Sequence, residues 1–375
     1  MIYNTRDKTP FSSDQINNIM FSRNVIRKSY YSYDLLDEND GFIDEIGVEN
    51  CKVSNNVFRQ YKRLANFKLN EYDQKEINFL KERIRPNFVL EIPSGDKIKY
   101  PLGIFLLSSP TQEIEGKRKT RDIEAFDKTI ILNDDKLTES FYVQQGRLYT
   151  DVITQLFQEN GIATFKITQS NLELASQREF FVGTSIKDII NQLLNEINYD
   201  SLTVDADGWF ICEPYITPEN RPIKHTYKAD DSSVILPKLI SSIDLLNRAN
   251  VFVAYSVNTE TKEILTSPKI VNGSLASRIS TVARGREITK VINVENAPNM
   301  EMLIRKTERA LIEESTAYTH FNYQTMVIPT HGNGDNVYID IPNYSEIPLV
   351  FNETSWEIDT NSKTMQHNLR RLVNL

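Results

Sequence analysis

The residue types that most often carry catalysis or metal binding are sparse in this sequence. Four histidines among 375 residues are a thin supply for a histidine-based catalyst. The one histidine-centred polar loop is 330–335 (THGNGD), between two predicted strands. A metal site there would need further ligands, and none stands nearby at ligand spacing. Its glycines and asparagine suit the positive φ angles of a loop tip, so the sequence favours a turn over a site.

The cysteines and one acidic loop also favour structural roles. Cys51 and Cys212 are too few for a disulfide framework and too far apart for a metal knuckle, and we expect both to be reduced and buried. Cys212 lies inside a predicted strand and not at a helix start, which disfavours a cysteine peptidase. The run 205–208 (DADG) superficially resembles a calcium loop, but Thr203 and Pro214 occupy the first and twelfth positions. Neither supplies a carboxylate, so a hairpin turn is expected.

No enzyme motif is complete. The phosphate-binding, dinucleotide-binding, serine-hydrolase and zinc-protease patterns are all missing. Glu314 and Ser315 match the Glu-Ser pair of lytic transglycosylases, but the residues that follow carry none of that family's further pattern. A muramidase needs only one or two suitable carboxyl groups, and 51 acidic residues leave that reading open. We therefore expect no enzyme, no cofactor and no metal, with a peptidoglycan hydrolase as the alternative.

Length and composition indicate an ordinary globular protein of two or three domains. Forty-three basic and 51 acidic residues give a formal charge of −8, which argues against a protein that binds phosphate backbones. No stretch of about 18 apolar residues occurs, so no membrane-spanning helix is expected. The N-terminal residues are polar and lack the apolar core of a signal peptide, so none is expected.

Alternating patterns predict strands through the first third of the chain. They lie at 25–36, 58–69, 88–92, 98–107 and 117–126. The basic cluster 117–121 opens the last of these. Because it is short and no aromatic residue interleaves with it, a solvated or subunit-facing strand is favoured over a nucleic-acid patch.

The middle of the chain changes to a helical period. Apolar residues at 148–157 and 186–197 predict two helices, with Gly161 as the C-terminal cap of the first and Thr184 or Ser185 as the N-cap of the second. A further helix is expected at 299–315, and strands then resume. The last strand, 363–372, is polar enough to be an edge or an interface. These blocks predict domains at 1–130 (β), 131–215 (mixed α/β) and 216–375 (β, with an inserted helical segment near 299–316).

The order of several short motifs resembles the tail-tip or baseplate hub family of tailed bacteriophages. That family includes the structural N-terminal part of the tail-associated lysin of siphophages and the related hub of contractile tails. The resemblance spans about 12–373, and each motif is a structural signature. The matching residues are Pro101, Leu102 and Gly103 in YPLGIF, Arg121 and Asp127 in RDIEAFD, Tyr199 in NYDSL, Asp205, Asp207 and Gly208 in DADG, Pro214 and Tyr215 in EPY, Trp356 in SWEI, and Met365, His367, Arg370 and Arg371 in MQHNLRR.

The resemblance implies an α+β, predominantly antiparallel β fold with two tail-tube-like β-barrel domains separated by a mixed α/β region. Three chains would form a ring and present six barrels to a six-fold tail tube. The implied function is a non-enzymatic hub of the phage tail tip or baseplate, made in the host cytoplasm and placed in the virion at the distal end of the tail. It would anchor distal tail and receptor-binding proteins and gate the DNA channel.

The implied partners are the other two subunits, the distal tail protein, the C-terminus of the tape measure protein and receptor-binding or baseplate periphery proteins. Phage DNA would be a partner only in transit. Three chains at −8 carry about −24, so we expect a net-acidic channel wall that repels DNA. The sequence stops just past the closing strands, so a hub without a lysin is expected. A carbohydrate-binding adhesin that uses exposed tyrosines is a third reading.

Overall fold

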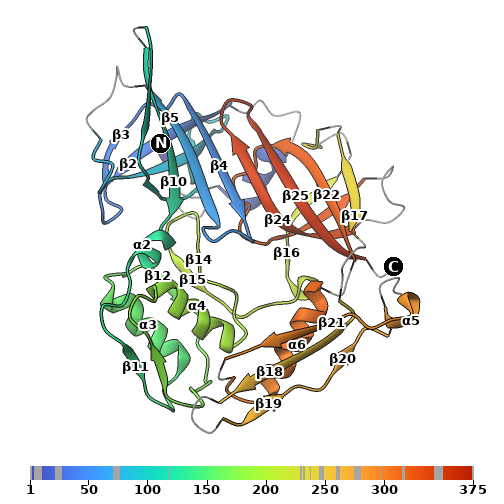
Figure 1. Ribbon diagram of the computed structural model, residues 1–375. Helices are drawn as coiled ribbons and strands as arrows, with labels where there is room; N and C mark the ends of the chain where they lie inside the picture. The colour runs from blue at the N-terminus through green and yellow to red at the C-terminus, as the bar shows by residue number, and fades with distance from the viewer. Residues whose placement is uncertain are drawn as a thin grey trace.

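The computed structural model describes residues 2–3, 11–21, 28–70, 77–116, 118–228, 230, 233–236, 238–244, 249–258, 262–273, 280–295, 297–314, 317–341 and 349–373. The fold is α+β with mostly antiparallel strands (Figure 1). The helices are α1 (Ser13–Phe21), α2 (Thr129–Asp134), α3 (Tyr149–Glu159), α4 (Ile186–Glu196), α5 (Thr281–Arg284), α6 (Met300–Glu314) and the 3-10 turn η3 (Pro218–Asn220). No helix in these ranges is long and apolar enough to cross a membrane.

The strands fall into one large sheet and three small ones. Their bounds are β1 (Ile2–Tyr3), β2 (Lys28–Leu36), β3 (Phe42–Glu45), β4 (Asn50–Asn56), β5 (Arg63–Asn70), β6 (Arg83–Glu91), β7 (Lys97–Pro101), β8 (Phe105–Leu107), β9 (Thr111–Glu115), β10 (Arg118–Asp127), β11 (Phe141–Val143), β12 (Phe165–Ile167), β13 (Arg178–Phe180), β14 (Thr203–Val204), β15 (Phe210–Cys212), β16 (Ile223–Lys228), β17 (Ile240–Asp244), β18 (Val251–Val257), β19 (Ile264–Thr266), β20 (Ile270–Val271), β21 (Thr289–Asn293), β22 (Ala317–Met326), β23 (Asn336–Asp340), β24 (Leu349–Asp359) and β25 (Thr364–Val373).

A 16-stranded sheet joins the two ends of the chain. We call β2–β10 the first β block, and β16, β17 and β22–β25 the second β block. The main path runs β1-β7-β6-β8-β10-β5-β4-β24-β25-β22-β17, and β4 pairs antiparallel with β24, with Asn55 opposite Trp356. No pairing joins the two ends of this path among the described strands. The sheet therefore continues from one β block into the other.

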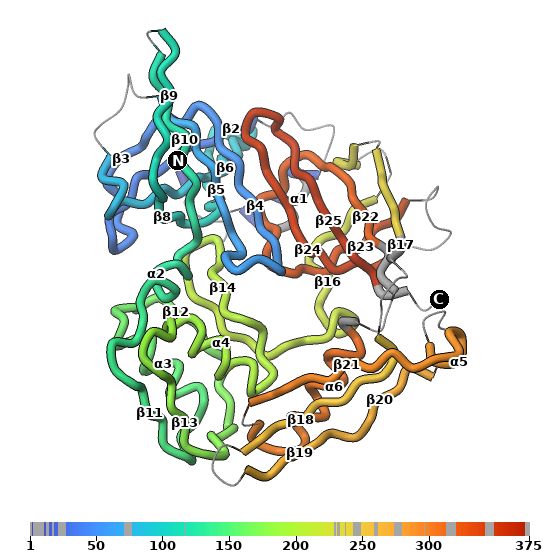
Figure 2. The backbone as a smooth tube through the Cα atoms, in the orientation of Figure 1, coloured from blue at the N-terminus to red at the C-terminus, as the bar shows by residue number. Residues whose placement is uncertain are grey.

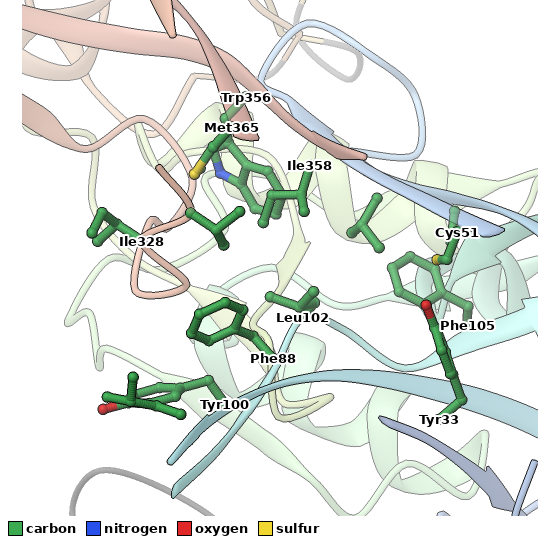
Figure 3. Close-up of a cluster of buried hydrophobic side chains, with 14 of the residues drawn as sticks. Tyr33, Cys51, Phe88, Tyr100, Leu102, Phe105, Ile328, Trp356, Ile358 and Met365 are labelled. Carbon is green, nitrogen blue, oxygen red and sulfur yellow. The ribbon is translucent and has the colours of Figure 1, made fainter. Parts of the chain in front are cut away.

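The two β blocks share one continuous apolar core. Tyr33, Phe67 and Phe105 of the first block and Trp356 and Met365 of the second all belong to it. The aromatic rings meet edge to face, with 6.2 Å between the ring centroids of Phe67 and Phe105. Figure 3 shows Tyr33 and Phe105 beside Cys51, and Trp356 beside Met365. Burial of these large side chains is the main force that holds the two blocks together.

Two small α/β units lie on one side of the sheet (Figure 1). The first α/β unit contains α2–α4 and β11–β15, and the apolar stripe of α4 is buried in its core, as the sequence predicts. The Ser185 side chain caps α4 by accepting a hydrogen bond from the Asp188 backbone, and Gly161 follows α3 with φ +69°. The second α/β unit contains β18–β21, α5 and α6, and lies between β17 and β22 in the chain. There α6 packs against β18 through Leu303 and Ala254.

Three sequence expectations need correction. The single strand expected at 98–107 is interrupted at 102–104 and forms β7 and β8. The strand expected at 58–69 begins only at Arg63, because residues 57–62 form a turn in which the Asn56 side chain accepts a hydrogen bond from the Phe58 backbone. The polar strand β25 is not an edge, since it pairs with β22 on one side and β24 on the other. Its buried residues Met365, His367 and Leu369 alternate with more exposed polar ones, which explains its composition.

The strand expected at 117–126 is β10, and Lys117 lies outside the described residues. Its first half pairs with β9, whose five residues are all exposed. The β9–β10 hairpin projects beyond the body of the molecule (Figure 2). Both cysteines are free and buried as expected, and burial raises the pKa of Cys212 to about 12, so neither thiol is poised for nucleophilic chemistry.

Candidate functional site

Many of the signature residues meet where the first β block joins the first α/β unit. The Leu102 carbonyl accepts a hydrogen bond of 2.9 Å from the buried Arg63 guanidinium. Asp127 accepts the Arg63 backbone N–H through one carboxylate oxygen and the Thr129 backbone N–H through the other, at 3.0 and 2.9 Å. Gly103 has φ +142°, and a Cβ there would lie 2.7 Å from the Phe105 ring. These contacts fix the angle at which β10 continues into α2.

The DADG segment is a hairpin turn, as the sequence predicts. One carboxylate oxygen of Asp205 accepts the backbone N–H groups of Asp207 and Trp209, at 3.0 and 2.9 Å. Gly208 has φ +84°, and its carbonyl accepts a 3.0 Å hydrogen bond from the buried Lys128 amine. A carboxylate that is already used by two backbone donors closes a turn and needs no calcium ion.

Lys128 also ties this turn to the first β block. Its amine lies 2.6 Å from the Asp40 carboxylate, which Arg83 contacts as well. The lysine side chain is 5% exposed. Two permanent cations therefore neutralise one acidic group at this junction.

Tyr199, Pro214 and Tyr215 lie at a second junction. The Tyr199 hydroxyl donates a hydrogen bond to the Thr168 carbonyl at 3.0 Å. The backbone of Tyr199 forms an isolated antiparallel β-bridge with Pro214. The Arg309 guanidinium of the second α/β unit stacks 3.7 Å from the Tyr215 ring centroid. Arg309 also donates to the Tyr199 carbonyl, which follows α4, at 3.2 Å and therefore links the two α/β units.

A cavity of about 600 Å³ opens where the two β blocks and the two α/β units meet. Asp200 in its wall pairs with Arg221 and Arg309, at 3.0 and 3.1 Å. Lys62 donates to the Ser201 hydroxyl at 2.7 Å. Its pKa is lowered to about 8, chiefly by burial and further by the Lys187 and Arg309 charges. The lining also includes Lys290 and the signature residue Arg370. The two β blocks and the two α/β units therefore meet at the wall of this cavity through polar contacts.

The remaining signature residues lie away from these junctions. The Arg121 guanidinium stacks on the Phe79 ring, and Arg371 lies in β25 opposite Thr319. The Trp356 indole N–H donates to the Gly332 carbonyl at 3.0 Å, which fastens the 330–335 loop to β24. The structure thus distributes the signature residues over the sheet and the junctions and does not gather them into one site.

A buried histidine–glutamate cluster lies inside the second β block, and sequence reasoning did not find it. His331 and His367 each direct Nδ1 at a different oxygen of Glu353, at 2.6 and 2.7 Å. Their Nε2 atoms contact the Tyr227 hydroxyl at 2.7 Å and the Thr325 hydroxyl at 2.8 Å. The side chains of both histidines and of Glu353 are no more than 1% exposed. Four strands (β16, β22, β24 and β25) and the 330–335 loop thus supply one network.

Aromatic stacking holds the cluster from both sides. The His225 ring is parallel to the His331 ring, with 3.7 Å between centroids, and its Nε2 lies 3.4 Å from Asp335. Tyr323 stacks on His367 at 4.6 Å. Three of the four histidines therefore meet in one place, although they are far apart in sequence.

Burial dominates the protonation of the cluster. It raises the pKa of Glu353, and hydrogen bonding to His367 offsets that rise only in part. Burial lowers the pKa of His331 well below its usual value and lowers that of His367 to about 4. Burial therefore favours the neutral form of both histidines.

By residue type, His331, Glu353 and His367 resemble a set of metal ligands. The nitrogen–oxygen distances of 2.6 and 2.7 Å are those of direct hydrogen bonds, and every ring nitrogen of the two histidines has a hydrogen-bonding partner. Ligands that surround one zinc ion stand about 2 Å from the metal and therefore farther apart from one another. The arrangement fits a hydrogen-bonded network and not a metal centre.

The signal for this cluster in the sequence is weak. Glu353 and His367 occupy inward positions of two strands that pair with each other, but neither register nor pairing is known before the fold. His331 is 22 residues from Glu353 in the sequence. A search for metal ligands at short sequence spacing from His331 therefore does not find Glu353. The loop around His331 is a turn as expected, yet the histidine itself is buried.

Comparisons with known proteins identify the fold. No family model matches the sequence, and no curated protein matches it significantly. A tail protein from Neisseria meningitidis superposes with a TM-score of 0.63 at 11% identity, over 91% of this chain and 97% of that one. A 43 kDa prophage tail protein from Shewanella oneidensis gives 0.61 at 10% identity, over 92% and 99%.

A prophage tail protein from Listeria monocytogenes gives a TM-score of 0.56 at 12% identity, over 91% of this chain and 94% of that one. At these identities the likeness establishes the fold. The expected resemblance to phage tail and baseplate hub proteins is thus confirmed at that level: this chain has the fold of phage tail proteins.

Proposed function

We propose that this protein is a structural, non-enzymatic hub at the distal end of a phage tail. The observation that carries the proposal is its fold, which phage tail proteins share over more than 90% of both chains. The mostly antiparallel β architecture and the joined β blocks support it, since broad β surfaces suit assembly of a tube. The anticipated partners are the distal tail protein, the tape measure C-terminus and receptor-binding or baseplate periphery proteins.

The proposed assembly is a ring of three chains. In it the domains 1–130 and 216–375 would each act as a tube-like barrel, with 131–215 between them, so that three chains match a six-fold tube. The net charge of −8 per chain supports an acidic channel wall past which DNA moves without binding. Gating would follow from a rigid-body or loop rearrangement on host contact.

The first experiment is the mass of the full chain in solution by light scattering, over a range of concentrations. A mass of three times 43.3 kDa supports the ring, and electron microscopy of that species then tests for a central channel. A bore lined by lysine and arginine would contradict the acidic wall. Lysis of peptidoglycan in a zymogram would contradict the non-enzymatic role and support the hydrolase.

The β9–β10 hairpin is the proposed subunit contact. It projects from the body, and its Ile114 is 59% exposed although apolar. Ile114→Asp is expected to reduce the trimer population at least tenfold at a fixed concentration, because a charge would be desolvated in the contact. The matched control is Ile264→Asp in the second α/β unit, where Ile264 is 67% exposed. Equal trimer fractions for both variants would remove the hairpin from the interface.

A further inference from the structure

The cavity where the two β blocks and the two α/β units meet concentrates positive charge. Its volume of about 600 Å³ is within the range of about 300–1,000 Å³ that is typical of small-molecule sites. The chain as a whole carries a formal charge of −8, so the wall of this cavity has the opposite sign to the molecule. The described residues that line it include one acidic side chain, Asp200, and five basic ones: Lys62, Arg221, Lys290, Arg309 and Arg370.

Asp200 is already shared between two of these cations. Its Oδ1 lies 3.1 Å from Arg309 and its Oδ2 lies 3.0 Å from Arg221. The Arg221 guanidinium also donates to the carbonyls of Ile216 and Gly334, each at 2.9 Å. These contacts use three of the five N–H groups of Arg221, and two remain for a further acceptor.

Lys62 is the buried cation of this wall. The residue is 8% exposed, and its amine donates to the hydroxyl and the carbonyl of Ser201, at 2.7 and 3.4 Å. Both acceptors are neutral, and within the described part of the chain Lys62 forms no ion pair. Because burying a charge without a counterion is costly, the position of this amine favours an anion in the cavity.

The charges around Lys62 do not remove this cost. Asp200 and Asp127 favour the charged amine, whereas Lys187 and Arg309 oppose it. Burial is the largest influence, and together with the two opposing cations it lowers the pKa of Lys62 to about 8. An anion beside the amine would favour its charged form and raise this pKa.

We propose that this cavity binds a small oxyanion with two or more negative charges, such as phosphate, sulfate or a polycarboxylate, and that Lys62 is its buried contact. Arg221 holds the anion through its two remaining N–H groups, because a guanidinium matches the spacing of phosphate and carboxylate oxygens. The other basic side chains of the wall add positive charge around it. This site goes beyond the proposed structural role and does not depend on formation of a ring.

The bound anion would stabilise the junction. Lys62 belongs to the turn before β5 in the first β block, Arg309 to α6 in the second α/β unit, and Arg370 to β25 in the second β block. An anion among these cations offsets their mutual repulsion and binds only the folded chain. It should therefore shift the unfolding equilibrium toward the native state.

The test is urea unfolding of the full chain with sulfate, phosphate or citrate, each at millimolar concentration and balanced with chloride to one ionic strength. Low concentrations keep general salt effects on burial small. An anion at about ten times its Kd should lower the unfolding equilibrium constant about tenfold. Tighter binding of citrate would identify carboxylate groups as the preferred chemistry, and tighter binding of phosphate and sulfate a tetrahedral oxyanion. The proposal fails when none of the three anions stabilises the chain more than chloride does.

The variant is Lys62→Met, which removes the charge and keeps an apolar chain of similar length. Calorimetric titration should show binding weakened at least tenfold, because the buried charge-assisted contact is lost. Lys119→Met on the exposed β9–β10 hairpin removes the same charge outside the cavity and should bind like the wild type. Equal weakening in the two variants would overturn the proposal, because the anion would then respond to overall charge and not to this cavity.

A second measurement needs no variant. Crystals of the wild type grown with selenate should show an anomalous peak within hydrogen-bonding distance of the Lys62 amine. Selenate at the surface alone, with water in the cavity, would contradict the proposal. A single-stranded oligonucleotide that binds more tightly than phosphate and loses affinity in Lys62→Met would contradict it too, because the cavity would then be part of a nucleic-acid site.

Discussion

The two β blocks each bury a carboxyl group, and they neutralise it by different means. In the first block Asp34, 3% exposed, pairs with Arg85 at 2.8 Å and Lys99 at 3.2 Å. In the second block Glu353, 1% exposed, pairs only with histidines among its recorded ion pairs. Both groups belong to one continuous sheet, so the contrast arises from the neighbouring side chains and not from the architecture.

The difference sets opposite pKa shifts. Burial alone raises the pKa of Asp34, but hydrogen bonds from Arg85 and Asn87 and the Lys99 charge outweigh it, so the pKa falls below its ordinary value. Among the described residues Glu353 forms ion pairs only with histidines, so burial prevails and its pKa rises. The first block should therefore lose stability in acid and the second as the solution becomes alkaline.

Phe105→Ala sets the reference for a purely apolar contact and should have the largest effect. Phe105 is fully buried against Phe67, and truncation should reduce the free energy of unfolding by about 3–5 kcal/mol. Because the contact carries no charge, the loss should be the same at about pH 5 and about pH 8. Urea unfolding checks this, and a loss that changes with pH would show that the apolar core and the titrating groups are coupled.

His367→Leu should cost about 3 kcal/mol, because in a dry interior it leaves the Thr325 hydroxyl without its histidine partner and leaves Glu353 with His331 as its one remaining histidine partner. The loss should increase as pH rises, since ionised Glu353 then lacks one of its donors. Gln366→Leu on the exposed side of the same strand is the control and should change stability by less than about 0.5 kcal/mol. A pH-independent loss in His367→Leu would contradict the contrast between the blocks.

Lys128→Met should cost about 2 kcal/mol, because it removes the amine that Asp40 and the Gly208 carbonyl share. Thermal unfolding measures the effect, with Lys119→Met on the exposed hairpin as the control. An equal loss in the two variants would show that the effect does not come from the contacts of Lys128 with Asp40 and Gly208.

Asp34→Asn should have the smallest effect, about 1–2 kcal/mol at neutral pH, because Arg85 and Lys99 are partly exposed and are resolvated by water. The lowered pKa of Asp34 means that its contribution is present above about pH 3.9 and is lost as pH falls, so the variant and the wild type should converge at about pH 2. Urea midpoints across pH measure this. A difference that persists in acid would assign the effect to packing and not to charge.

The local sequence pattern was sufficient to predict many of the helices, strands and turns. The stripe of α4, the αL cap at Gly161 and the DADG turn follow from residues within a few positions of one another, and the structure confirms all three. The strand expected at 58–69 was wrong at its start because Asn56 closes a turn, which alternation alone does not reveal. The order of the signature motifs led to the correct fold, whereas the roles of the individual residues stay a prediction.

The sequence by itself determined the short-range structure, the acidic net charge and the resemblance to phage tail proteins, because these depend on neighbouring residues and on composition. Only the tertiary structure brought β4 beside β24 and placed His331, Glu353 and His367 in one buried cluster. Strand pairing across 300 residues is set by burial of a shared core, which no local pattern encodes. The raised pKa of Glu353 depends on that burial, so it too was decided by the fold.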